Sequence, residues 1–450
     1  MGENDQRLGA LWDNEIAGQC EATDADLARC SRSQDEIHID IMTVPAVALL
    51  TRIKLVWPPL YRFRHMEQEI LAVNPACHER APPALADKVA FLRRPASYAG
   101  AAEVAARETH MSWVFLVGDD AYKLKKPVRF PYLDFSTLPR RERACRAEVA
   151  LNRRLAPDVY LGVLPLTADN GMALGGAGEP VDWLVHMRRL DERFMLDRMI
   201  GEGRLIAKDI DRLADVLAAF YRRAEPVMLP PAVHLAETRR MLALNRSVLL
   251  DPRFGLPAGH VRQIDAALER FVVQCGGLIA ARLRERRVVD GHGDLRPEHI
   301  FLGERIRVID CLEFNARLRV VDPFDEIAYL ALECERLGAA WAGARLRRRM
   351  TRLLRDGPAE PLFTFYSAYR AMLRARLAIA HLDEEPPRTP EKWPLLARHY
   401  LALAAQSACG LEAWLRIRTG RLGCGSRKAA GSRRPKAARR AGRRACPTAA

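Results

Sequence analysis

Two aspartates, Asp294 and Asp310, have the type and spacing of residues that could do chemistry together. Two short apolar runs, 300–302 and 306–309, lie between them and are separated by Gly303-Glu304-Arg305, which predicts a hairpin. A hairpin would bring the loop before its first strand close to the end of its second strand, and therefore Asp294 close to Asp310. Two neighbouring carboxylates repel each other unless a positive charge lies between them. The pattern indicates a divalent metal ion carrying the phosphates of a nucleotide, with one carboxylate left to accept a proton from a hydroxyl group.

A lysine and a glutamate further upstream could complete such a site. Strand alternation places Lys123 and Lys125 on the same face of an expected strand over 121–126. Glu148 lies on the apolar face of an expected helix, where a carboxylate needs a buried cationic partner because an unpaired buried charge is costly. We expect Lys123 to be that partner, with Lys125 as the second choice. The alternatives for Glu148 are the nearby arginines Arg141 and Arg153.

The elements expected around these residues change in character along the chain. The first half of this region predicts an antiparallel sheet with one helix packed on it. The helix is expected from Ser136 or Thr137 to about Leu155, and the strands at 112–117, 121–126, 159–166, 172–174 and 183–188. Beyond Asp191 apolar residues recur at helical spacing, near 213–221, 232–250, 260–284, 323–337, 339–355, 361–382 and 393–417. The predicted fold class is α+β, with a small antiparallel-sheet lobe, a larger helical lobe and the site between them.

The chain is expected to have four parts. Residues 1–82 form an N-terminal extension of uncertain order, 83–190 the small lobe, and 191–417 the helical lobe with the catalytic hairpin 288–310. A basic disordered tail follows at 418–450.

Charge and composition limit the classes of partner. The 450 residues carry a formal net charge of +15, but ten basic residues and no acidic one lie between 421 and 450, so residues 1–420 carry only +5 of it. Because this tail has no aromatic residues to stack on bases, we expect at most non-specific contact with polyanions. The ten cysteines include no CxxC pair, which favours a reducing cytoplasmic location. We expect no signal peptide and no membrane span, since the longest apolar stretch, 41–50, is too short to cross a bilayer.

The sequence around the two aspartates resembles the aminoglycoside phosphotransferase family, whose fold is that of the protein kinases. His292-Gly293-Asp294 with Pro297 and His299, followed by Val308-Ile309-Asp310, carries the resemblance. Further segments resemble an uncharacterised bacterial branch of the family, so that about residues 85–415 are covered: 108–116, 121–128, 133–138, 151–157, 309–315 and 369–371. Many members of that branch carry a P-loop kinase domain after this unit. No GxxxxGK[ST] motif follows residue 415, so we expect only the first unit.

The resemblance implies a kinase that moves the γ-phosphoryl group of ATP, or alternatively of GTP, to a hydroxyl group of a small molecule. Asp294 would be the catalytic base, and His292 would brace the catalytic loop by hydrogen bonding. Asp310 would hold Mg²⁺ against the β- and γ-phosphates. The cofactor-binding residues would be Lys123, Glu148, Lys125 and Ser112, the last in the loop 108–112 that covers the phosphates.

Position 299 is the clearest departure from the family, which has Asn there as a second metal ligand. Because Mg²⁺ prefers oxygen whereas Mn²⁺ tolerates imidazole, His299 is a ligand with an altered metal preference, a donor that supports the ligands, or a mark of lost activity. Glu313 could replace the missing amide as a metal ligand, or pair with Arg317 or Arg319. Arg296 replaces a family histidine and either meets phosphate or faces solvent. The alternatives to catalysis are a pseudokinase, which binds nucleotide without transferring phosphate, and a polyanion-binding protein driven by the tail.

Overall fold

The computed structural model describes residues 83–428 except 131, 170 and 384–388. The chain divides into Met1–His78 and Glu79–Ala450, and all described residues belong to the second unit. The expected extension over 1–82 and the tail residues 429–450 lie outside the described residues.

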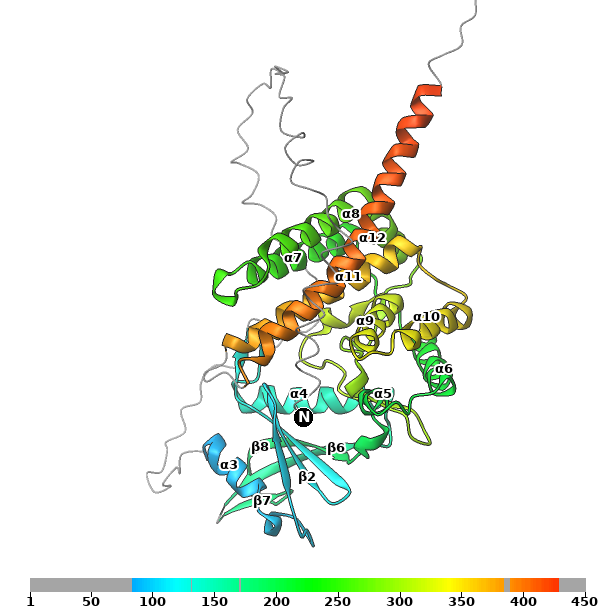
Figure 1. Cartoon of the computed structure of the whole chain (residues 1–450). Coiled ribbons are helices and arrows are strands. Elements are labelled where there is room, and N and C mark those ends of the chain that lie inside the picture. Colours follow the sequence, from blue (N-terminus) through cyan, green and yellow to red (C-terminus); the bar gives the residue numbers. More distant parts are fainter. Residues whose placement is uncertain (1–82, 131, 170, 384–388, 429–450) are drawn as a thin grey trace, which may run out of the picture. The chain divides into compact units, whose positions relative to one another are not determined.

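The first part of the described chain is an antiparallel sheet with the strand order β1-β2-β3-β8-β6-β7 (Figure 1). Its strands are β1 (Ala105–Glu108), β2 (Ser112–Val117), β3 (Asp120–Lys125), β6 (Tyr160–Ala168), β7 (Met172–Leu174) and β8 (Glu179–Arg188). Helix α3 (Leu85–Leu92) precedes the sheet, and a small hairpin of β4 (Arg129–Phe130) and β5 (Leu133–Asp134) leads into α4 (Leu138–Asn152). The sequence predicted all of these elements except β1, α3 and the β4–β5 hairpin.

The two faces of the sheet are covered by different helices. Tyr122 and Leu124 of β3 are buried in one apolar cluster with Leu92 of α3. Cys145 and Val149 of α4 pack in another cluster with strand residues of the opposite face. Lys123 and Lys125 alternate with Tyr122 and Leu124, so their side chains lie on the α4 side. Helix α4 begins after Thr137, as expected, but the Thr137 side chain makes no capping hydrogen bond.

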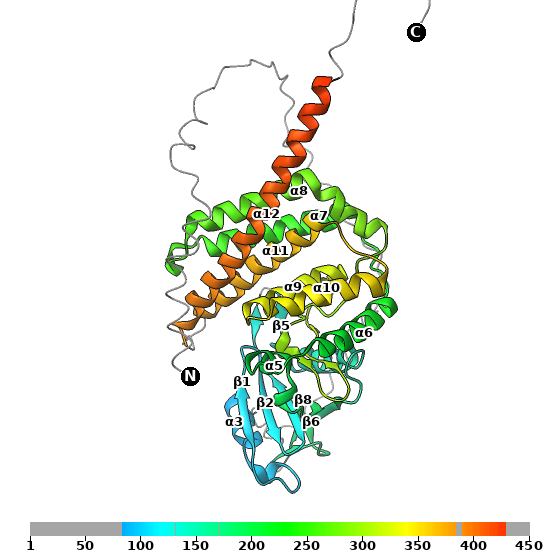
Figure 2. The same ribbon diagram turned by 45° about the vertical axis from the view of Figure 1, so that its right-hand side comes forward.

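Helices make up most of the remaining described chain (Figure 2). They are α5 (Leu196–Gly201), α6 (Ala207–Arg223), α7 (Pro231–Leu249), α8 (Ala258–Arg284), α9 (Pro323–Arg336), α10 (Ala340–Leu354), α11 (Glu360–Ile379) and α12 (Lys392–Lys428). Helices α11 and α12 lie side by side, and α12 continues to Lys428, past the expected lobe boundary at 417. Each added residue contributes one more backbone hydrogen bond, and no proline lies between Pro394, in the first turn, and Lys428, so a helix started at Lys392 can extend into the basic segment.

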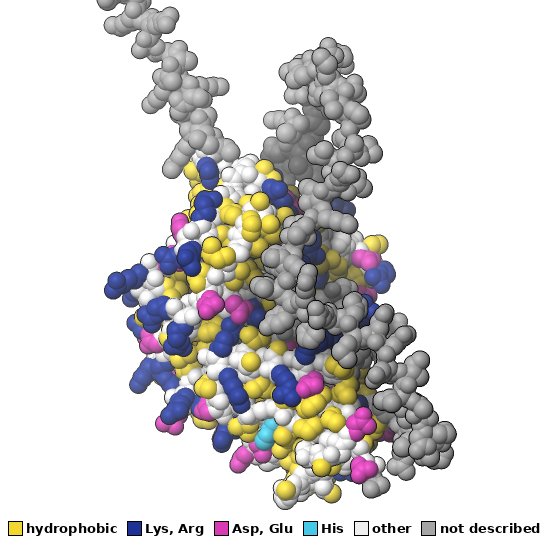
Figure 3. All heavy atoms as spheres, turned by 180° about the vertical axis from the view of Figure 1, so that it is seen from behind, with side chains coloured by type: hydrophobic (Ala, Val, Ile, Leu, Met, Phe, Trp, Pro, Cys, Tyr) yellow, Lys and Arg dark blue, Asp and Glu magenta, His cyan; other side chains and the backbone are white. Residues whose placement is uncertain are grey.

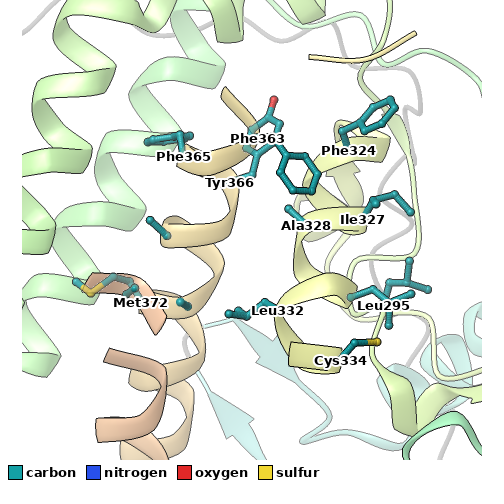
Figure 4. Close-up of a cluster of buried hydrophobic side chains, with 14 of the residues drawn as sticks. Leu295, Phe324, Ile327, Ala328, Leu332, Cys334, Phe363, Phe365, Tyr366 and Met372 are labelled. Atoms are coloured by element: carbon teal, nitrogen blue, oxygen red, sulfur yellow. The ribbon is translucent and has the colours of Figure 1, made fainter. Parts of the chain in front are cut away.

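Four short strands between α8 and α9 flank the segment that contains Asp294 and Asp310. They are β9 (Val289–Asp290), β10 (Ile300–Phe301), β11 (Arg307–Val308) and β12 (Val320–Val321), paired as β9–β12 and β10–β11. Leu295, between β9 and β10, is fully buried against α9 (Figure 4). In that view Leu295 and Cys334 lie on the side of α9 away from α11, whereas Leu332 points toward α11. The loop that contains Asp294 is thereby fastened to the core of the helical lobe.

The predicted α+β class, with an antiparallel-sheet lobe followed by a helical lobe, is confirmed. None of the helices in the described part of the chain has the length and hydropathy of a membrane span. Lys and Arg side chains are scattered over the face drawn in Figure 3, with Asp and Glu side chains among them. This distribution agrees with the small net charge of residues 1–420.

Candidate active site

The hairpin predicted between the two aspartates is present. Strands β10 and β11 pair antiparallel, with Ile300 opposite Val308. His299, at the start of the hairpin, contacts both carboxylates: its Nδ1 is 3.7 Å from Asp294 Oδ2 and its Nε2 is 3.5 Å from Asp310 Oδ2. Asp294 and Asp310 therefore lie on either side of one imidazole ring.

The backbone of Asp310 has an unusual conformation. Its φ of 61° is in the left-handed region that non-glycine residues rarely adopt. The surrounding structure holds it there, because the Asp310 N–H donates to Tyr160 Oη (3.1 Å) and the Cys311 N–H donates to Asn152 Oδ1 of α4 (2.9 Å). Backbone strain of this kind clusters at functional sites. The Asp310 side chain is 44% exposed.

Lys123 connects the sheet lobe to the hairpin segment that ends at Asp310. Its Nζ donates to Glu148 Oε1 of α4 (2.9 Å) and to Asp310 Oδ1 (2.7 Å). Burial alone would lower the pKa of Lys123, but the two carboxylates raise it well above its ordinary value. The partial burial of Asp310 would by itself raise its pKa, but the adjacent Lys123 ammonium holds the pKa far below its ordinary value. The expected Lys123–Glu148 pair is formed, and both partners are charged at neutral pH.

Lys125 forms a second, more deeply buried connection. Its Nζ donates to Glu148 Oε2 (2.5 Å) and to Glu313, and its side chain is only 1% exposed. The alternative that Glu313 pairs with Arg317 or Arg319 is therefore wrong. The chain after the turn at Asp310 brings Glu313 to the sheet, where Lys125 engages it. Glu148 uses both lysines, whereas Arg141 pairs with Asp182 of β8.

The Asp294 carboxylate accepts two hydrogen bonds from side chains. Tyr329 of α9 donates its hydroxyl to Oδ1 (2.9 Å), and Arg296 donates Nε–H to Oδ2 (3.0 Å). Burial alone would raise the pKa of Asp294, but the Arg296 guanidinium holds it below its ordinary value. The carboxylate is therefore ionised and fixed in orientation.

His292 lies under the loop and braces it. Its Nδ1 accepts the Asp294 N–H (3.3 Å), so its Nε2 carries the proton and donates to the Ile309 carbonyl (2.9 Å). Burial lowers the pKa of His292 to about 4, which keeps the ring neutral. Glu326 of α9 accepts the backbone N–H groups of His292 and Gly293. The bracing geometry expected of His292 is present.

Ser112 differs from its expected setting. It is 3% exposed and begins β2 opposite Lys125, rather than lying in an open loop. Its contact with phosphate stays a prediction.

Sequence reasoning missed three residues that hold this site: Tyr329, Glu326 and Tyr160, whose hydroxyl accepts the Asp310 N–H. Tyr329 and Glu326 lie on α9 one turn apart and on the same face as buried apolar residues. The sequence did contain a signal for Glu326 and Tyr329: both polar residues lie on the apolar face of a helix that closely follows Asp310.

The chain is similar to curated proteins that are uncharacterized and, at low identity, to several solved structures. No family model matches the chain. Uncharacterized proteins of Mycobacterium tuberculosis and Mycobacterium bovis are 37% identical over 287 residues, which is 62% of this chain and 56% of theirs. The chain thus spans a little more than half the length of these curated relatives.

Solved structures that match include aminoglycoside phosphotransferases and choline or ethanolamine kinases. A choline/ethanolamine kinase family protein of Mesorhizobium loti is 16% identical, with a TM-score of 0.39 over 68% of this chain and 94% of that one. A putative aminoglycoside phosphotransferase of Ralstonia eutropha is 12% identical, with a TM-score of 0.38 over 70% and 94%. A thermostable mutant of an aminoglycoside phosphotransferase, solved with AMP-PNP and hygromycin B, is 13% identical, with a TM-score of 0.43 over 72% and 98%.

Proposed function

We propose that the chain transfers the γ-phosphoryl group of ATP to a hydroxyl group of a small molecule. The observation that carries this proposal is the Lys123 ammonium, which contacts Glu148 of the sheet lobe and Asp310 of the catalytic hairpin. Protein kinases use a lysine held by a helix glutamate, and an aspartate that holds metal, to position the phosphates of ATP. GTP is the alternative nucleotide.

Asp294 would receive the proton of the acceptor hydroxyl. In the transfer step the acceptor oxygen forms a bond to the γ-phosphorus, and the bond from that phosphorus to the β,γ-bridging oxygen breaks, its electron pair leaving with ADP. The hydroxyl proton passes to a carboxylate oxygen of Asp294. Each of the two oxygens accepts one side-chain hydrogen bond and keeps a further lone pair for this proton. Because the pKa of Asp294 is lowered, rate enhancement would come mainly from positioning and charge neutralisation.

Asp310 is the residue that fits Mg²⁺. Its Oδ2 accepts no hydrogen bond from the described residues, and carboxylate oxygen is the ligand that Mg²⁺ prefers. No group of three or more His, Cys, Asp or Glu side chains within the described part of the chain could hold an ion by itself, so the ion would be shared with phosphate oxygens. When bound, it would neutralise the charge on the β- and γ-phosphates. Mn²⁺ is the alternative ion, and Glu313 does not fit because Lys125 engages it in a buried pair.

The acceptor is proposed to be a small molecule rather than a protein. The chain passes from Asp310 through one short 3₁₀ turn (Ala316–Arg319) and strand β12 directly into α9 at Pro323. This leaves no long segment on which a protein substrate could dock.

The test offers the protein ATP and a panel of hydroxylated metabolites as acceptors, with Mg²⁺ or Mn²⁺ present. Phosphotransfer is measured as the formation of ADP. Asp294→Asn should reduce the rate by about 10²–10⁴-fold, the usual contribution of a general base. Asp215→Asn, on the exposed side of α6, is the matched control and should leave the rate unchanged. If wild type and Asp294→Asn form ADP at equal rates, the catalytic proposal is wrong.

A pseudokinase is the second candidate, and the ion pair of Arg296 with Asp294 favours it because that pair weakens the proposed base. A pseudokinase would bind nucleotide without transferring phosphate to any member of the panel. Tight nucleotide binding with no product from wild type would select this candidate.

A further inference from the structure

Arg296 lies at the centre of the catalytic loop and contacts three of its side chains. Its Nε donates to Asp294 Oδ2 (3.0 Å), and one terminal nitrogen is 3.0 Å from Glu298 Oε1. The other terminal nitrogen is 3.2 Å from His299 Nε2. The guanidinium is therefore a fixed positive charge beside the proposed base, and not a solvent-facing side chain.

The hydrogen bonds of His299 determine where its ring proton lies. Nδ1 is 2.9 Å from the Asp294 carbonyl oxygen, which can only accept, so Nδ1 carries the proton. A guanidinium can only donate, so Nε2 accepts from Arg296. The one lone pair of the ring is thus used by Arg296. His299 has none left for a metal ion in this arrangement.

Protein kinases hold two Mg²⁺ ions, one on an aspartate and the other on an asparagine of the catalytic loop. The residues of this chain do not fit the second ion. Position 299 offers no oxygen, and Glu313 is held by Lys125 in a buried pair. A second dication there would also lie next to the Arg296 guanidinium, which repels it.

We propose that the site holds a single divalent ion, on Asp310, and that Arg296 supplies the positive charge that a second ion supplies elsewhere. This inference rests on the proposed phosphotransferase function. A guanidinium has five N–H donors and pairs well with phosphate oxygens. Three donors are used within the loop, which leaves two for the γ-phosphate.

The number of bound ions tests the first half of the proposal without relying on activity. Mn²⁺ bound to the full chain is counted by electron paramagnetic resonance with saturating AMP-PNP. One Mn²⁺ per chain is expected, and two per chain would overturn the inference while leaving the proposed function intact. No Mn²⁺ and no AMP-PNP bound would instead contradict the proposed function, and the inference with it.

A double variant, Arg296→His with His299→Asn, should admit a second Mn²⁺. It removes the guanidinium and restores an amide oxygen at 299. If this variant, still folded by circular dichroism, binds one Mn²⁺, these two side chains do not exclude the second ion and the inference fails.

The second half of the proposal is tested by comparing AMP-PNP with ADP, which lacks the γ-phosphate. Arg296→Gln should weaken AMP-PNP binding at least tenfold and leave ADP binding within twofold. Arg305→Gln, in the exposed turn of the same hairpin, is the matched control and should change neither affinity. Equal loss of both affinities, or of neither, would show that Arg296 does not meet the γ-phosphate.

Discussion

Replacing Lys125 by methionine should strongly destabilise the protein, because Lys125 compensates two buried carboxylates. Its side chain is 1% exposed and lies between Glu148, which is fully buried, and Glu313. Methionine fills a similar volume but carries no charge, so Glu313 would lose its ion-pair partner, the one cation that contacts it among the residues the structure describes. Glu148 would keep only Lys123.

The expected loss is large. Removing one partner of a buried ion pair costs about 3–5 kcal/mol, since the remaining charge is left without compensation. An exposed pair contributes only about 0–1 kcal/mol. Burial already raises the pKa of Glu313, so in the variant this carboxyl should protonate more readily and recover part of the loss at low pH.

The measurement is the free energy of unfolding in urea at pH 7. Lys126→Met is the matched control: its partner Glu108, at the edge of the same sheet, is 38% exposed and would stay solvated without the lysine, so this variant should lose less than about 1 kcal/mol. Adding Glu313→Gln to Lys125→Met removes one uncompensated charge and should restore part of the stability. If Lys125→Met and Lys126→Met unfold at the same urea concentration, the buried network does not stabilise the fold as described.

Three further predictions concern the framework of the site. Asp182→Asn should cost about 3–5 kcal/mol in urea unfolding because it leaves Lys88 and Arg141 buried without their shared carboxylate, whereas the exposed Glu179→Gln should cost almost nothing. Gly291→Ala should lower the free energy of unfolding by about 1–3 kcal/mol and reduce activity, since the new Cβ would lie 2.6 Å from Glu326 Oε2 and against Val321. The Cβ of Gly201→Ala would meet no neighbour, so that variant should be tolerated. Equal stability of the two variants would contradict the crowding at Gly291. The pKa of His292 is about 4 in the folded chain and about 6.5 in the unfolded chain, so between these pH values only the unfolded chain binds this proton. The free energy of unfolding should therefore fall by roughly 3 kcal/mol as the pH drops from 7 to 4. The His292→Gln variant should lack this share of the decrease, and identical pH profiles of the two proteins would contradict the prediction.

Local patterns made much of this fold predictable. The β2–β3 hairpin follows from two strand-like runs, rich in apolar and aromatic residues, on either side of Gly118, and α9 follows from apolar spacing after Asp322 and Pro323. Strand β1 could not be predicted because Ala105–Glu108 has no alternating apolar pattern; it forms by pairing with the edge of β2. Such a strand depends on its neighbour, and a single-sequence pattern does not contain that information.

The sequence predicted those parts of the site in which both residues belong to one strand or flank one hairpin. Alternation placed Lys123 and Lys125 on one face, and hairpin geometry placed Asp294 near Asp310. Sequence could not show that both lysines reach Glu148, because that depends on how closely α4 packs on the sheet. Nor could it show the left-handed backbone of Asp310, which turns Glu313 toward Lys125.

Nucleotide binding by the Lys123→Met variant tests the central claim most directly. Isothermal titration of AMP-PNP with Mg²⁺ into wild type should give saturable binding, and Lys123→Met should weaken it at least tenfold. Lys208→Met, exposed on α6, should bind as wild type does. If wild type binds no nucleotide, or if Lys123→Met binds as tightly as wild type, then Lys123, Glu148 and Asp310 do not form a nucleotide site.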